Sequence, residues 1–174
     1  MRRTPVTVLE DPIAEARRQW EAHGWSDAAP GMAAVTSLVR AAHLAQARVD
    51  EALKQVDITF ARFELLTLLM FSRRGAMPMS KVSARLQVHP ASVTHAVNRL
   101  VADGLAERIP DPTDGRGALV AITDQGVALL REATPLLNDV FTNLGMASAD
   151  LERIVGLCTV FRHAQGDGTA AQQP

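Results

Sequence analysis

The chain has 174 residues, of which 47% are apolar, and a formal net charge of −1; this length allows one domain with a hydrophobic core. The near-neutral charge excludes a protein that coats nucleic acid through bulk charge. It does not exclude a site-specific nucleic-acid binder, which needs only a local basic surface. No apolar run approaches the roughly 20 residues that span a bilayer, and the first residues contain no apolar signal segment. The single cysteine, Cys158, fits a reducing compartment. We therefore expect a cytoplasmic protein.

The first third of the chain predicts two helices after a flexible start at residues 1–10. Asp11 followed by Pro12 is a typical helix start, and the helix that follows carries Trp20 at helical spacing from other apolar residues. A break at residues 26–31 precedes a long amphipathic helix over residues 32–56, with an apolar stripe along one face.

The middle of the chain predicts a compact run of short helices. Residues 60–72 are apolar nearly all round, which predicts a central, buried helix. Residues 73–79 are expected to form a loop, and Ser80 is expected to cap a short helix that ends near residue 86. After a turn, Pro90 suits the first turn of a helix that runs to about residue 103, and Gly104 suits its end.

The last third predicts a hairpin and two more helices. Residues 105–110 and 118–123 read as strands, and residues 111–117 form the loop between them. Thr123 or Asp124 caps a helix to about residue 145, and Ser148 starts the last one. The predicted units are an extension helix over 1–30, long helices over 31–57 and 124–164, a unit of short helices and a hairpin over 58–123, and a disordered tail over 165–174.

This order of elements, two short helices, a hairpin and a new helix start, is the layout of a winged helix-turn-helix. On a helical wheel of residues 90–102, valines and leucines fill one face. The opposite face carries one arginine and several short side chains that can form hydrogen bonds. Such side chains are suited to contact the edges of bases in double-stranded DNA. The candidate DNA-binding residues of this helix are Ser92, Thr94, His95, Asn98 and Arg99. An ordinary solvated helix face is the alternative interpretation.

The hairpin loop adds two candidates to the DNA-binding set. An arginine at the tip of a hairpin, here Arg116, is placed to enter the adjacent minor groove, where the potential is most negative. Asp114 is two residues away and can accept a hydrogen bond from Arg116 or stabilise the loop. A charged turn that only keeps the hairpin soluble is the alternative.

The stretch SVTHAVNRLVADGLAERIPDPTDGRGALVAITDQG resembles the MarR family of bacterial regulators. The resemblance covers about residues 33–163 and rests on the Ser-Val-Thr start of the reading helix, the Asp-x-Arg wing and the Thr-x-x-Gly helix start. It implies a mainly α fold with a small β-hairpin wing, in which the helices over 31–57 and 124–164 form a homodimer interface. It also implies that residues 58–123 are the DNA-binding domain. It further implies a ligand-responsive regulator, most often a repressor, that binds a pseudo-palindromic operator.

The extra N-terminal helix resembles the urate-responsive subgroup of that family. This resemblance implies a small aromatic or anionic effector and gives Trp20, His43 and Glu64 as candidate ligand-binding residues, although Ala96 stands where that subgroup carries an arginine. Plain helix packing for Trp20 and a structural role for His43 are the alternatives, and a ligand other than urate remains open.

Two other functional classes compete with a DNA-binding regulator. A winged helix that binds only proteins fits the charge of −1. An enzyme is not expected, because the sequence has no Gly-rich phosphate loop and no Ser/His/Asp set, and no cofactor is predicted. The five histidines lack metal-ligand spacing, so no metal site is predicted either, and Cys158 reads as a packed thiol on an apolar stripe rather than a redox sensor.

Overall fold

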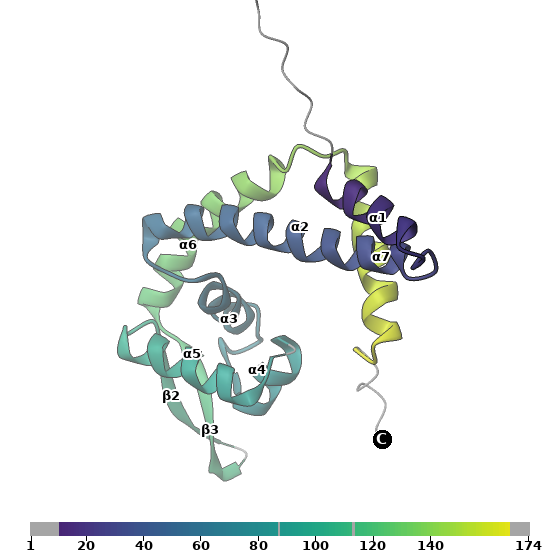
Figure 1. Ribbon diagram of the computed structural model, residues 1–174. Helices are drawn as coiled ribbons and strands as arrows, with labels where there is room; N and C mark the ends of the chain where they lie inside the picture. Colours follow the sequence, from purple (N-terminus) through teal and green to yellow (C-terminus); the bar gives the residue numbers. More distant parts are fainter. Residues whose placement is uncertain (1–10, 87, 113, 168–174) are drawn as a thin grey trace, which may run out of the picture.

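A winged unit of short helices and strands joins a long helix, and the first and last helices of the chain lie outside the winged unit (Figure 1). The computed structural model describes residues 11–86, 88–112 and 114–167, without the side chains of 114–117, so the predictions for residues 1–10 and 168–174 lie outside it. In chain order the elements are α1 (Pro12–Ala22), α2 (Ala29–Leu53), a 3-10 turn (Lys54–Val56), α3 (Phe60–Met70), β1 (Ala76–Pro78), α4 (Met79–Leu86), α5 (Pro90–Ala102), β2 (Ala106–Asp111), β3 (Asp114–Ile122), α6 (Asp124–Thr142) and α7 (Ser148–Ala164).

The centre of the core is α3, as its all-round apolar sequence predicts. Leu65, Leu66 and Leu69 of this helix are fully buried, and it packs against α2, α4, α5, α6 and the sheet. Such a helix gains burial on every side, which stabilises the unit by roughly 1.5–3 kcal/mol per fully buried leucine. The elements that carry the candidate DNA-binding residues are therefore assembled around one central helix.

The three strands form an antiparallel sheet in the order β1-β3-β2, with Met77 of β1 opposite Val120 of β3. The expectation of a loop over residues 73–79 therefore holds for residues 73–75 and was wrong for residues 76–79. A three-residue strand that ends in proline is too short to show an alternating pattern in the sequence. It forms only because β3 offers a free edge to pair with and Met77 is buried in the core. The expected hairpin loop was also too long, because β3 already begins at Asp114, which pairs with Asp111.

The ends of the helices follow the local sequence in most places. Asp11 accepts the Ile13 N–H at 3.0 Å, and Thr123, one of the two residues expected to cap α6, accepts the Gly126 N–H at 3.1 Å. Gly104, with φ +71°, ends α5 as expected. Ser80 does not cap α4: the helix begins one residue earlier, at Met79, because it continues directly from β1.

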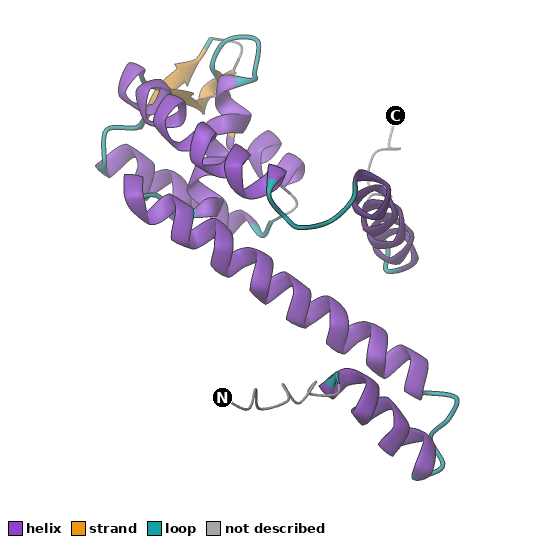
Figure 2. Ribbon diagram, turned by 90° about the horizontal axis from the view of Figure 1, so that it is seen from above, coloured by secondary structure: helices purple, strands orange, loops and turns teal. Residues whose placement is uncertain are grey.

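The long helix α2 leaves the winged unit and carries α1 along its far end (Figure 2). Only Ala29, Val49 and Leu53 of α2 are buried, so most of its predicted apolar stripe is exposed within the chain. The last helix, α7, buries no residue at all in the described part of the chain. None of the described helices is long and apolar enough to cross a membrane.

Candidate nucleic-acid interface

The helix predicted to read DNA, α5, presents the expected polar face. Val93, Val97 and Leu100 are buried against the rest of the winged unit, which fixes the rotation of the helix about its axis. The five candidate residues Ser92, Thr94, His95, Asn98 and Arg99 are all exposed on the other side. Because they share one face of one helix, they can meet a single DNA groove together.

The start of α5 is fixed by the turn before it. His89 is the N-cap and accepts the Ala91 N–H through Nδ1 at 3.2 Å, and the Ser83 hydroxyl donates to the Val88 carbonyl at 2.8 Å across the turn. The Thr94 hydroxyl donates to the Pro90 carbonyl at 3.0 Å, which leaves its oxygen lone pairs facing outward as acceptors. The first turn of the helix is thus held by side chains that are close in sequence.

A contact between α5 and the wing was not foreseen. Arg108, on β2, donates from its guanidinium to Asn98 Oδ1 at 2.8 Å. An asparagine that binds adenine uses both its oxygen and its amide nitrogen, and here the oxygen is already engaged. Arg108 therefore orients Asn98 and belongs to the site. The two residues are ten positions apart in the sequence, and only the folded structure brings them together.

The wing residues Asp114 and Arg116 lie within β3, opposite the end of β2. Their side chains lie outside the described residues, so their role stays a prediction.

The three candidate ligand-binding residues are not brought together within one chain. Trp20 packs edge-to-face on Trp25, with ring centroids 5.3 Å apart, beside the far end of α2. His43 is exposed in the middle of α2, and Glu64 projects from α3 in the winged unit. A shared site of all three would need residues from a second chain.

Glu64 borders an apolar hollow of about 370 Å³ between α3, α4 and α6. Its other walls are mostly aromatic and aliphatic: Phe60, Phe63, Leu68, Phe71, Leu86 and Phe141. Burial raises the pKa of the Glu64 carboxyl above its ordinary value, because the low-dielectric wall disfavours the ionised form. The Thr67 hydroxyl, in the same wall, is buried without a hydrogen-bond partner among the described residues. The hollow thus offers an apolar space bordered by the exposed Glu64 carboxyl and the buried Thr67 hydroxyl.

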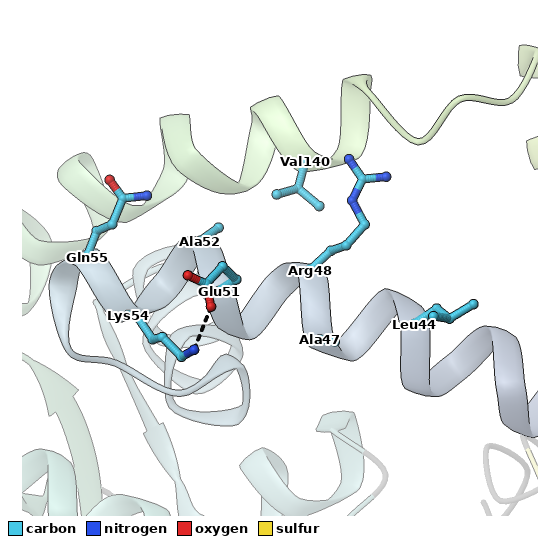
Figure 3. A pocket seen from close by; sticks show the side chains of 8 residues that line it. All are labelled: Leu44, Ala47, Arg48, Glu51, Ala52, Lys54, Gln55 and Val140. Carbon is cyan, nitrogen blue, oxygen red and sulfur yellow. Dashed lines mark hydrogen bonds and ion pairs between the residues drawn. The ribbon is translucent and has the colours of Figure 1, made fainter. Parts of the chain in front are cut away.

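A wider trough of about 850 Å³ follows the seam between α2 and α6 (Figure 3). Its charged side chains already have partners within the chain: Arg48 donates to the Asn143 carbonyl at 2.8 Å, and Lys54 pairs with Glu51 at 2.5 Å. Because these charges are paired within the chain and the trough lies along the helices predicted to dimerise, the trough is a weaker candidate for an effector site than the hollow beside Glu64.

Apolar side chains remain uncovered on the helices predicted to dimerise. Val35, Val39 and Leu44 of α2 are exposed, and so are Ile154, Val155, Leu157, Val160 and Phe161 of α7. Cys158 on α7 is half-buried, so its thiol is less buried than the sequence predicts but is not fully exposed. Such a large apolar surface marks an interaction site.

Comparison with known proteins places these features in context. A family model described as the MarR family matches residues 56–117. The repressor IacR of Pseudomonas putida is 26% identical over 117 residues, which cover 66% of this chain and 69% of IacR. The structure of Sco5413, a MarR family transcriptional regulator from Streptomyces coelicolor, is 41% identical with a TM-score of 0.71, over 80% of this chain and 97% of that one. A mutant of Escherichia coli MarR in complex with operator DNA is 25% identical with a TM-score of 0.64, over 73% of this chain and 94% of that one.

Proposed function

Because this chain belongs to the MarR family of transcriptional regulators, we propose that it is a ligand-responsive repressor that binds a pseudo-palindromic operator in double-stranded DNA as a homodimer. The observation that carries the proposal is the exposed polar face of α5, held by its buried valines and leucine and flanked by the hairpin. A regulator that binds operator DNA in this way would act in the cytoplasm.

The two halves of the proposed homodimer meet through the apolar faces of α2 and α7. These faces have no cover within the described chain, and their burial between two copies would remove them from water. A two-fold axis then relates two copies of α5, so the half-sites lie about 10 base pairs, roughly 34–36 Å, apart. The same axis brings Trp20 and His43 of each protomer toward the other chain, where they can complete an effector site.

The proposed effector occupies the hollow beside Glu64. Its aromatic and aliphatic walls suit a small aromatic molecule. The carboxylate disfavours an anionic group beside it, so of the two predicted effector classes the aromatic one, with a hydrogen-bond donor or a positive charge toward Glu64, fits this hollow better. Because α3 contributes to both this hollow and the support of α5, a ligand here can change how α5 is held.

A titration of the full-length protein into a labelled fragment of its own upstream DNA, across a salt series and with random DNA as competitor, tests the proposed function. Binding that resists competitor and falls steeply with salt supports it. Binding no tighter than to random DNA on this and other candidate operators would favour the alternative, a winged helix that binds only proteins.

Arg99→Ala tests direct base reading by α5. If Arg99 makes a bidentate contact to guanine, its loss should cost about 1–3 kcal/mol in operator affinity and relax the preference at one base pair. Arg74→Ala is the matched control, because it removes the same charge from an exposed arginine in the loop after α3. Equal losses on operator and random DNA would show that Arg99 contacts only the backbone.

Glu64→Gln should stabilise the protein at neutral pH but not in acid. The raised pKa means that the ionised carboxylate is disfavoured in the folded state; this cost is absent below the ordinary glutamate range and grows as pH rises through the raised value. Thermal unfolding at pH 7.5 and pH 4 should therefore show a gap between variant and wild type only at pH 7.5. Glu132→Gln, on the exposed side of α6, controls for the loss of a surface carboxylate. A variant that is less stable than wild type at pH 7.5 would contradict the assignment.

A further inference from the structure

We infer that a groove between the start of α3 and the polar face of α5 binds a backbone phosphate of duplex DNA; the inference rests on the proposed DNA-binding function. The groove has a volume of about 610 Å³. Thr59 and Arg62 line it from α3, and Ser92, His95 and Arg99 line it from α5, with three alanines between them. The two helices pack against each other in the winged unit (Figure 1).

The chemistry of the groove suits an oxyanion. Its lining contains two arginines, one histidine and two hydroxyls, and no carboxylate. Guanidinium groups bind phosphate oxygens through charge-assisted hydrogen bonds, and hydroxyls donate to the same oxygens. Arg99 has no ion-pair partner among the described residues, so its charge adds to the positive potential of the groove while its guanidinium contacts a base.

Arg62 forms the inner wall and is held there by one partner. Its side chain is only 13% exposed, and its guanidinium pairs with Asp103, the residue that caps the C-terminus of α5. Its Nε is buried without a hydrogen-bond partner among the described residues. The ion pair joins residues 41 positions apart, whereas the other described ion pairs join residues three to five apart. Asp103 does not line the groove, so it fixes Arg62 in place while reducing the positive potential that Arg62 provides.

A phosphate of the DNA backbone is a better occupant than a small anion. Ser92, His95 and Arg99 belong both to this groove and to the face of α5 that is proposed to enter the major groove. A helix in the major groove is flanked by the phosphates of the two strands. The groove opens beside the polar face of α5, so a flanking phosphate can reach it when α5 reads bases. Thr59 and Arg62 thus extend the DNA-binding set to α3.

The test compares Arg62→Gln with Asp103→Asn in the full-length protein. Glutamine removes the charge but can still donate to Asp103, whereas asparagine breaks the ion pair and leaves Arg62 charged. The slope of log affinity against log salt is measured on the operator and on random duplex DNA. Arg62→Gln should lower this slope by about 0.9 per protomer on both DNAs, since one phosphate contact is lost. Asp103→Asn should keep the wild-type slope and tighten binding, because the groove becomes more positive.

Controls separate this site from a structural ion pair and from failure of the proposed function. Each variant is first melted, and Arg62→Lys, which keeps the charge, should retain the wild-type slope. Equal weakening by Arg62→Gln and Asp103→Asn, or an unchanged slope in Arg62→Gln, would overturn the inference while leaving DNA binding intact. A wild-type protein with no salt-dependent binding to any duplex would instead refute the proposed function. Thermal stabilisation by inorganic phosphate that is lost in Arg62→Gln, together with an unchanged salt slope on DNA in that variant, would assign the groove to a small anion and overturn the backbone assignment.

Discussion

We expect Gly126→Ala to lower the free energy of unfolding by about 3 kcal/mol, the upper range for inserting an atom into a packed core. Gly126 lies in the first turn of α6, directly behind the Thr123 cap. A Cβ at this position would stand 2.2 Å from the Leu105 carbonyl oxygen and 2.8 Å from Ile122 Cγ1. The nearest atom belongs to the backbone that joins α5 to β2, so it cannot turn aside as the end of a long side chain would. Chemical denaturation, monitored by circular dichroism, measures the loss.

Gly31→Ala is the matched control for this substitution. Gly31 also lies in the first turn of a helix, α2, but a Cβ there meets no atom within 4 Å. Alanine should therefore leave stability unchanged or raise it by up to about 1 kcal/mol, since it has the higher helix propensity and restricts the unfolded chain. If both variants unfold at the same denaturant concentration as wild type, the close approach of α6 to Leu105 is wrong.

The double substitution Leu157→Glu with Val160→Glu should convert the proposed dimer to monomers and weaken operator binding by at least about 100-fold, because two linked half-sites then bind separately. Both side chains are about 70% exposed on α7, at 71% and 68%, and α7 buries no residue against its own chain. The winged unit should therefore keep its fold, with an unchanged far-ultraviolet circular dichroism spectrum. Sedimentation analysis measures the mass, and a titration with operator DNA measures the affinity.

Arg153→Glu controls for charge in that experiment. It changes the net charge by the same −2 on the same helix, but it replaces a side chain that is 78% exposed and pairs only with Asp150 among the described residues. It should remain dimeric and lose little affinity. A double glutamate variant that is still dimeric would refute the α7 interface, whereas a monomeric variant with wild-type affinity would refute binding as a dimer.

Much of the architecture was predictable from the sequence because it depends on local patterns. The buried helix α3 follows from an apolar surface on all sides, and the orientation of α5 follows from Val93, Val97 and Leu100 at helical spacing. Asp11, Gly104 and Thr123 mark the ends of helices through the hydrogen bonds and backbone angles that their own neighbours require. The family resemblance rested on the same stretch, so the interpretation as a DNA-binding regulator needed no tertiary contact.

The tertiary structure decided everything that depends on partners far apart in the chain. Strand β1 exists because β3 offers a free edge, and its three residues carry no signal of their own. Asn98 is oriented by Arg108, Arg62 is held by Asp103, and the hollow beside Glu64 is completed by side chains from α4 and α6. Side-chain spacing determines which face of a helix is buried, because that periodicity is local. Which groups then face each other across a groove depends on how the helices pack, and packing is a property of the whole core.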